Sequence, residues 1–199
     1  MSTKNIKWVV SRYNHAISYL KDYTDDVVIY DRSDKPVRDS IIVPNLGSDI
    51  SDKFRFIIDN YDNLPDVAVY TKANIFDYIK PREFEKIKNN KTFTPILSLE
   101  HHTYEPVCRY NSKGMYEEIN NYWYLSSHPA KYFEDIKKIF GMDSRGYNEF
   151  APGSNYILPK ENILKHPKEL YQTLKSYLDW AVYPGDAQLI ERNLYYLWS

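Results

Sequence analysis

The stretch Pro65–Ile79 constrains the fold of this chain more than any other part of the sequence. Its first half, Asp66–Lys72, is a short apolar run rich in β-branched residues, and Pro65 stops any helix before it, so the pattern predicts a buried strand. The preceding segment, Ser48–Asn63, has helical spacing, because one face collects Ile50, Phe54, Ile57, Ile58 and Tyr61. A helix that leads through a short turn into a buried strand is half of an α/β crossover.

Polar residues follow the predicted strand. In open α/β sheets, ligands bind beyond the carboxyl ends of the strands. Asn74 and Asp77 come just after the strand, so we expect them to line a ligand crevice at this edge of the sheet.

The first thirty residues predict a second unit of the same kind. Ile6–Arg12 is a candidate strand, His15–Tyr23 has helical spacing, and Val27–Tyr30 is the next candidate strand. Polar residues follow both strands, which is the outline of a mononucleotide-binding β-α-β half. The Gly-rich G-x-G-x-x-G turn is missing, which argues against a Rossmann dinucleotide site.

The remaining segments alternate between short strands and amphipathic helices. The sequence predicts a short strand at Ile41–Val43, irregular loops and edge strands at 92–123, and a strand that ends near Leu158. It also predicts helices at 81–89, 129–140 and 187–198, and a helix that starts at Lys160–Ile163, resumes after Pro167 and runs to about Trp180. We therefore predict an α/β fold with a mixed, mostly parallel central sheet flanked by helices. Residues 1–199 would form a single domain with two halves, about 1–90 and about 91–199.

Charge and cysteine content argue against several classes of protein. The chain has 26 Lys and Arg against 27 Asp and Glu, a net charge of -1, so broad electrostatic capture of nucleic acid is not expected. The one cysteine, Cys108, cannot form an intramolecular disulfide and fits a reducing compartment. No apolar run approaches the roughly 18 residues of a membrane span. We expect a soluble cytoplasmic protein, and the Tyr- and Trp-rich termini are compatible with a homodimer.

A family resemblance is carried by six segments in a fixed order: WVVSRYN, VVIYDRSD, VPNLGSD, FIIDNYDNLPDVAVYTKANIFDY, FAPGSNYILPKENILKHPKELYQTL and ERNLYYLW. Through them the chain resembles proteins related to the small GT-A-fold glycosyltransferases of chlorella-type large DNA viruses, over roughly Ile6 to Trp198. The resemblance implies a minimal GT-A domain: residues 1–90 bind a nucleotide-diphosphate sugar, by preference a UDP-sugar, and residues 91–199 hold the acceptor. It also implies Mn²⁺ or Mg²⁺ on the diphosphate, a glycan, glycoprotein or small glycoside as acceptor, and the host cytoplasm as location if the chain is viral.

The chain departs from the family pattern at four places. Relatives carry Glu after RYN, an Asn-x-Gly-Arg-Glu run, Gln-Gly at the end of the central strand and Asp-His soon after it. The corresponding positions here are His15, Gly47–Asp49, Lys72–Ala73 and Asp77–Tyr78, and a strict D-x-D metal motif is absent. A second hypothesis is therefore a catalytically degenerate module of the same fold that binds sugar or nucleotide.

The resemblance implies that the nucleotide lies after the first two strands. Tyr13 would stack on a uracil-like base and Asn14 would bond to the base edge, with Arg12 in the same cluster; a turn Asn and a packing Tyr are the plain alternative. Asp31 follows the second strand, where an acidic residue accepts from ribose hydroxyls, or else is a solvated turn carboxylate. Asn45, in the turn before the next helix, is a further candidate contact.

Two residues near the central strand are candidates for neutralising the diphosphate. Asp77 is the candidate metal ligand, because one carboxylate with diphosphate oxygens and water can hold Mg²⁺ or Mn²⁺; its alternative role is a helix cap. Lys72 would instead neutralise the diphosphate directly, without a metal.

Two carboxylates near the C-terminus, Glu191 and Asp186, are the candidate catalytic bases, since an inverting transferase needs a base for the acceptor hydroxyl. Glu191 is favoured because it belongs to the ERNLYYLW block; its alternative is an ion pair with Arg192. The turn with Gly153 and Ser154 resembles the one that contacts the donor and acceptor sugars, where Gly153 would allow close backbone approach.

Overall fold

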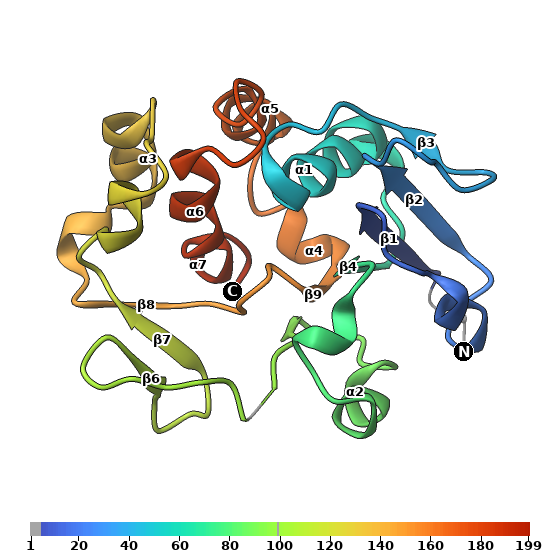
Figure 1. The fold of residues 1–199 in the computed structure, drawn as a ribbon, viewed down its shortest axis with the longest axis horizontal. Helices are drawn as coiled ribbons and strands as arrows, with labels where there is room; N and C mark the ends of the chain where they lie inside the picture. Colours follow the sequence, from blue (N-terminus) through green and yellow to red (C-terminus); the bar gives the residue numbers. More distant parts are fainter. Residues whose placement is uncertain (1–4, 99) are drawn as a thin grey trace.

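The computed structural model describes residues 5–98 and 100–199, and a six-stranded sheet runs through it (Figure 1). The strand order is β3-β2-β1-β4-β9-β5. The neighbours from β3 to β4 are parallel, whereas β9 runs antiparallel to both β4 and β5. The strands are β1 (Ile6–Arg12), β2 (Val27–Asp31), β3 (Ile41–Ile42), β4 (Val67–Lys72), β5 (Thr94–Pro95) and β9 (Tyr156–Pro159). The fold is thus mixed α/β with a mostly parallel sheet, as the sequence predicts.

Apolar side chains alternate along the strands and build a core on each face of the sheet. Val9 of β1 and Tyr70 of β4 pack in one core, whereas Trp8, Val10 and Val69 pack in the other. Both sets are buried, which explains why these strands read as continuous apolar runs instead of an alternation of apolar and polar residues.

Helices cover both faces. The larger core includes side chains from α1 (Ser48–Asn60), α4 (Lys160–Ile163), α5 (Lys168–Ser176), α6 (Gly185–Glu191) and α7 (Leu194–Trp198). The smaller core lies under α2 (Pro81–Ile87) and the 3-10 turns Ser18–Asp22 and Ile75–Asp77. No helix in the described part of the chain is long and apolar enough to cross a membrane.

A second, antiparallel sheet lies apart from the first. It consists of β6 (Cys108–Tyr110), β7 (Tyr116–Ile119) and β8 (Tyr147–Glu149), in that order. In Figure 1 this sheet and α3 (Phe133–Phe140) occupy the left of the view, and β1–β3 occupy the right. The segment 92–123, predicted as loops and edge strands, therefore contributes β5 to one sheet and β6 and β7 to the other.

Three predicted helices differ from the structure. The helix predicted at 129–140 begins only at Phe133. Between the first two strands only the 3-10 turn Ser18–Asp22 forms, and Leu20 is its one buried residue, so little packing energy supports a longer helix. The predicted helix 187–198 is divided into α6 and α7. The buried Asn193 causes the division, because its side chain donates to the Leu189 carbonyl and accepts from Arg145, which competes with regular helix hydrogen bonding.

Candidate functional site

A cleft of about 300 Å³ opens at the carboxyl edge of β1, β2 and β4. Ser11 and Arg12 end β1, Arg32 follows β2, and Lys72 ends β4. The remaining lining residues are Tyr13, His15, Asn45, Ser48, Asp49, Asn74, Tyr78 and Tyr183. The cleft therefore occupies the position at which ligands bind in open α/β sheets.

Five of the residues predicted to contact a ligand line this cleft: Arg12, Tyr13, Asn45, Lys72 and Asn74. Tyr13 is 44% exposed and lines the cleft, so it is placed to contact a ligand there. Asn14 is the next residue along and is exposed, with φ of 57°, but it does not line the cleft.

Asp31 lies beneath the cleft and is fully buried. Its carboxylate accepts from Arg12 Nη1 at 2.7 and 3.0 Å, from the Ser33 hydroxyl at 2.6 Å, and from the backbone N–H groups of Ser33 and Val37 at 3.0 Å. Burial alone would raise the pKa of Asp31, but the hydrogen bonds from Ser33 and Val37 and the Arg12 guanidinium lower it. These donors give Asp31 a structural role in the loop after β2, and the predicted ribose contact stays a prediction.

Arg32 makes a similar buried pair. Its guanidinium donates to both carboxylate oxygens of Asp52 at 2.8 Å and to the Leu46 carbonyl at 2.7 Å. Asp52 belongs to α1, so the pair holds the loop between β2 and α1 against the helix. Bidentate geometry of this kind is the strongest form of an Arg–carboxylate pair.

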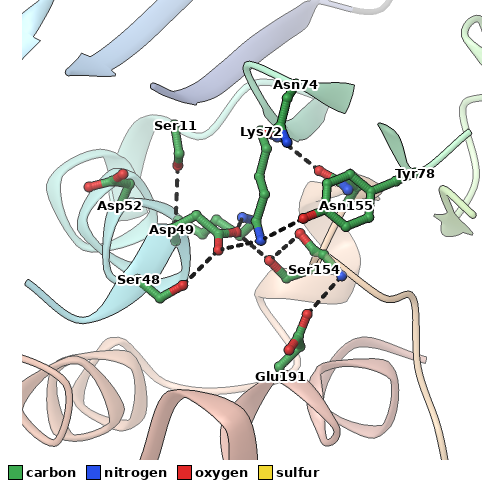
Figure 2. A network of polar contacts seen from close by, with 12 residues as sticks. Ser11, Ser48, Asp49, Asp52, Lys72, Asn74, Tyr78, Ser154, Asn155 and Glu191 are labelled. Carbon is green, nitrogen blue, oxygen red and sulfur yellow. Dashed lines mark hydrogen bonds and ion pairs between the residues drawn. The ribbon is translucent and has the colours of Figure 1, made fainter. Parts of the chain in front are cut away.

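Asp49, in the first turn of α1, is the carboxylate at the floor of the cleft (Figure 2). Its Oδ1 accepts from the Ser48 hydroxyl at 2.9 Å and lies 3.3 Å from Lys72 Nζ. Its Oδ2 accepts from Lys53 and from the Ser154 hydroxyl. Burial opposes ionisation, but Lys53 and Lys72 together hold the pKa of Asp49 well below its ordinary value. The floor of the cleft is thus one carboxylate shared by two ammonium groups.

Lys72 reaches the cleft from the end of β4. Its ammonium donates to the Tyr78 hydroxyl oxygen at 3.3 Å and lies 5.1 Å from the centre of the Tyr78 ring. Burial would lower the pKa of Lys72, but the carboxylates of Asp49 and Glu191 raise it above its ordinary value. The side chain is 23% exposed, so a charged ammonium faces the solvent of the cleft.

The turn at Gly153 and Ser154 contacts two residues of the cleft: Gly153 packs on Tyr78, and Ser154 donates to Asp49. Gly153 has φ of +84°, and a Cβ there would lie 2.4 Å from the Tyr78 ring. The Tyr78 ring therefore packs closely on Gly153, and contact of this turn with a sugar stays a prediction. Ser154 is fully buried with φ of 58°, and its hydroxyl donates to Asp49. Left-handed backbone at a non-glycine residue costs energy, and such strain concentrates at functional sites.

The first turn of α1 is held by a loop from the C-terminal part of the chain. The N-cap Gly47 has no side chain to cap the helix, and a Cβ there would lie 2.7 Å from Leu178 Cβ. Instead, the N–H groups of Gly47 and Ser48 donate to the carbonyls of Ala181 and Val182 at 2.8 and 3.1 Å. This contact carries Tyr183, the next residue, to the rim of the cleft.

The two predicted bases lie outside the cleft lining. Asp186 is fully buried and accepts from the backbone N–H groups of Lys131 and Tyr132 at 3.0 and 2.8 Å and from Trp180 Nε1 at 2.9 Å. These contacts give Asp186 a structural role between α6 and the segment before α3, and its predicted catalytic role stays a prediction. Glu191 is half-buried behind the Gly153 turn, and its Oε1 accepts from the Gly153 N–H at 2.8 Å (Figure 2).

The predicted metal ligand, Asp77, is exposed, accepts from Asn74 Nδ2 at 2.7 Å and does not line the cleft. Among the described residues, no three His, Cys, Asp or Glu side chains form a group that could hold a metal ion. The carboxylate of the cleft, Asp49, is already compensated by Lys53 and Lys72. A metal ion held by Asp77 together with diphosphate oxygens and water therefore stays a prediction.

Sequence reasoning assigned no site role to several lining residues. The rule that ligands bind at the carboxyl edge of the sheet could have identified Arg32 and Asp49 as site residues. Arg32 directly follows β2, and Asp49 lies in the first turn of α1. Tyr78 lies within the stretch on which the prediction is centred. Tyr183 has no local signal, since only the long-range contact of its loop with α1 carries it to the cleft.

Comparison of the chain with protein-family models, with curated proteins and with solved structures finds no match in any of the three.

Proposed function

We propose that the protein is a glycosyltransferase whose cleft binds a nucleotide-diphosphate sugar, by preference a UDP-sugar. The acceptor would be a glycan, a glycoprotein or a small glycoside. The observation that carries the proposal is the composition of the cleft at the carboxyl edge of β1, β2 and β4, where exposed aromatic rings surround a charged lysine. Stacking faces, amide groups and a cation are what a nucleotide diphosphate requires.

Each part of the donor has a matching group. Tyr13 and Tyr183, which are 44% and 60% exposed, would stack on the base and the sugar. The side-chain amides of Asn45 and Asn74 supply donors and acceptors for polar edges. Lys72 supplies positive charge for the diphosphate. The volume of about 300 Å³ lies at the small end of ligand sites, which fits a cleft that covers only part of the donor.

The proposed reaction forms one bond and breaks one. The oxygen of an acceptor hydroxyl bonds to the anomeric carbon of the donor sugar. The bond from that carbon to the diphosphate oxygen breaks, and its electron pair leaves with the nucleoside diphosphate. The hydroxyl proton passes to a base, for which Glu191 remains the candidate. A cation beside the departing diphosphate stabilises its negative charge in the transition state.

Calorimetric titration with UDP, UDP-glucose, UDP-galactose and ADP tests the binding step, and release of UDP from each UDP-sugar tests the transfer. We expect saturable binding of the uridine nucleotides, with Mn²⁺ present and absent as separate arms that test the predicted metal requirement. Failure of every nucleotide to bind would overturn the proposal.

A binding module without turnover is the second candidate. It is favoured by the position of the carboxylates, since Asp186 is fully buried and Glu191 is bonded to the Gly153 N–H outside the cleft lining. Glu191→Gln separates the two candidates, because glutamine keeps an oxygen for Gly153 and loses the base. The transferase predicts unchanged UDP binding and a loss of UDP release; binding without release by the unmodified protein would establish the module.

A further inference from the structure

The cationic side chains of Arg12, Arg32 and Lys72 line the cleft, and both arginines bind buried carboxylates. Arg12 donates to Asp31, and Arg32 makes two bonds of 2.8 Å to Asp52. An arginine in such a pair cannot turn toward a ligand without leaving a buried carboxylate unpaired, which is costly. Both arginines are therefore held in place by buried carboxylates, whereas Lys72 makes longer contacts with its oxygen partners.

Lys72 differs from both arginines in geometry. Its two oxygen partners, Asp49 Oδ1 and the Tyr78 hydroxyl, both lie at 3.3 Å, which is long for a charge-assisted hydrogen bond. Asp49 has the closer Lys53 as well, so it does not depend on Lys72 for its charge partner. An ammonium carries three N–H donors, so Lys72 keeps capacity for an anion in the cleft.

The Tyr78 hydroxyl adds a second donor at the same place. Its oxygen accepts from Lys72, so its own proton remains available to donate. The ring is fixed against Gly153, where only a glycine leaves room for it. Both Lys72 and Tyr78 line the cleft, and Figure 2 shows their polar ends beside each other, with Asp49 next to Lys72.

We propose that Lys72 and Tyr78 form a two-donor clamp that binds the diphosphate of the nucleotide in the place of a divalent cation. This inference rests on the proposed function and concerns how the same cleft handles the diphosphate charge. The phosphate oxygens take the ammonium and hydroxyl donors, while Lys53 stays with Asp49. The raised pKa of Lys72 keeps the ammonium charged throughout the neutral range.

The test is calorimetric titration of the full chain with UDP, UMP and uridine, in EDTA and in Mn²⁺. We expect the unmodified protein to bind UDP in EDTA nearly as tightly as in Mn²⁺. Lys72→Met should weaken UDP binding by about 10- to 100-fold, the loss of one charge-assisted contact, and leave uridine binding unchanged. Tyr78→Phe keeps the ring against Gly153 and should weaken UDP binding by about 3- to 10-fold.

Two controls keep the result interpretable. Lys80→Met removes an exposed lysine that pairs with Glu100 outside the cleft lining, and it should leave UDP affinity unchanged. Lys72→Arg retains the charge and should keep more UDP affinity than Lys72→Met, provided that both variants melt like the unmodified protein.

Three outcomes would overturn the clamp while leaving the proposed function in place: UDP binding only with Mn²⁺, full UDP affinity in Lys72→Met, or an equal loss for uridine and UDP in that variant. If no uridine compound binds at all, both the clamp and the proposed function are wrong.

Discussion

Two kinds of ion pair meet at the carboxyl edge of the sheet. Arg32 and Asp52 are both buried and bonded through two contacts of 2.8 Å, with a carbonyl as third partner. Lys72 and Asp49 are separated by 3.3 Å, and the lysine is partly exposed. The residue types are similar in the two pairs. We call the first pair closed, because both residues are buried and bonded to each other through two contacts, and the second open, because its lysine is partly exposed and its contact is long.

The difference teaches that charge near a cleft is not by itself evidence of function. A closed pair has its hydrogen-bonding capacity used within the fold, so its removal should affect stability. The open pair retains donors and solvent contact, so its removal should affect ligand binding. Four changes test this contrast, from the largest expected effect to the smallest.

Asp52→Asn breaks the closed pair with almost no change in volume. Arg32 would remain buried with an uncompensated charge, so we expect a loss of about 3–5 kcal/mol in the free energy of unfolding. Urea denaturation measures it. Asp59→Asn, at an exposed position on the same helix, is the control and should change stability by less than about 0.5 kcal/mol. A loss below about 1 kcal/mol in Asp52→Asn would show that the pair is not closed.

Gly153→Ala disturbs the open pair indirectly, because Gly153 packs on Tyr78 and the Tyr78 hydroxyl bonds to Lys72. The new methyl group would lie 2.4 Å from the Tyr78 ring at a residue with φ of +84°, so we expect a loss of about 1–3 kcal/mol in stability, with weaker UDP binding because Tyr78 must move. Gly146→Ala is the matched control, since no atom lies within 4 Å of a Cβ there. Equal stability of the two variants would contradict the packing of Tyr78 on Gly153.

Acid should weaken the fold through Asp49 and Asp31, whose pKa values are both lowered in the folded protein. Because the folded pKa lies below that of the unfolded chain, this stabilisation is complete above the unfolded pKa of about 4 and is lost as the pH falls toward the folded pKa. Each carboxyl contributes a slope of at most about 1.4 kcal/mol per pH unit. Urea denaturation from pH 7 to pH 3 measures the profile, and Asp49→Asn should flatten it below pH 4; an unchanged profile would argue against the Lys53–Asp49–Lys72 network.

Asp77→Ala is expected to have the smallest effect on stability and on UDP affinity. The side chain is exposed, bonds to Asn74 and lies outside the cleft lining, so stability should change by less than about 0.5 kcal/mol. UDP affinity measured with and without Mn²⁺ should also be unchanged. A selective loss of the Mn²⁺-dependent part of binding would restore the predicted metal site at Asp77.

Local pattern accounts for much of the fold. The strands at Ile6–Arg12 and Val67–Lys72 follow from short apolar runs, and their parallel pairing follows from the crossovers between them. The same reasoning brings Arg12, Tyr13 and Lys72 to one edge of the sheet, since parallel strands end on the same side. Boundaries were less predictable, as the 3-10 turn at Ser18–Asp22 and the division of the last helix at Asn193 show.

The amino-acid sequence by itself determined the α/β class and the edge at which a ligand would bind, because apolar periodicity and strand direction are properties of neighbouring residues. Only the tertiary structure decided which charged groups have donors or acceptors that are not already used within the fold. The Asp186 carboxylate accepts hydrogen bonds from backbone N–H groups 54 and 55 residues away in the sequence. The Ser154 hydroxyl donates to Asp49, which is 105 residues away. The reason is physical: the free energy of a charge depends on burial and on partners from distant segments, and no local pattern specifies either.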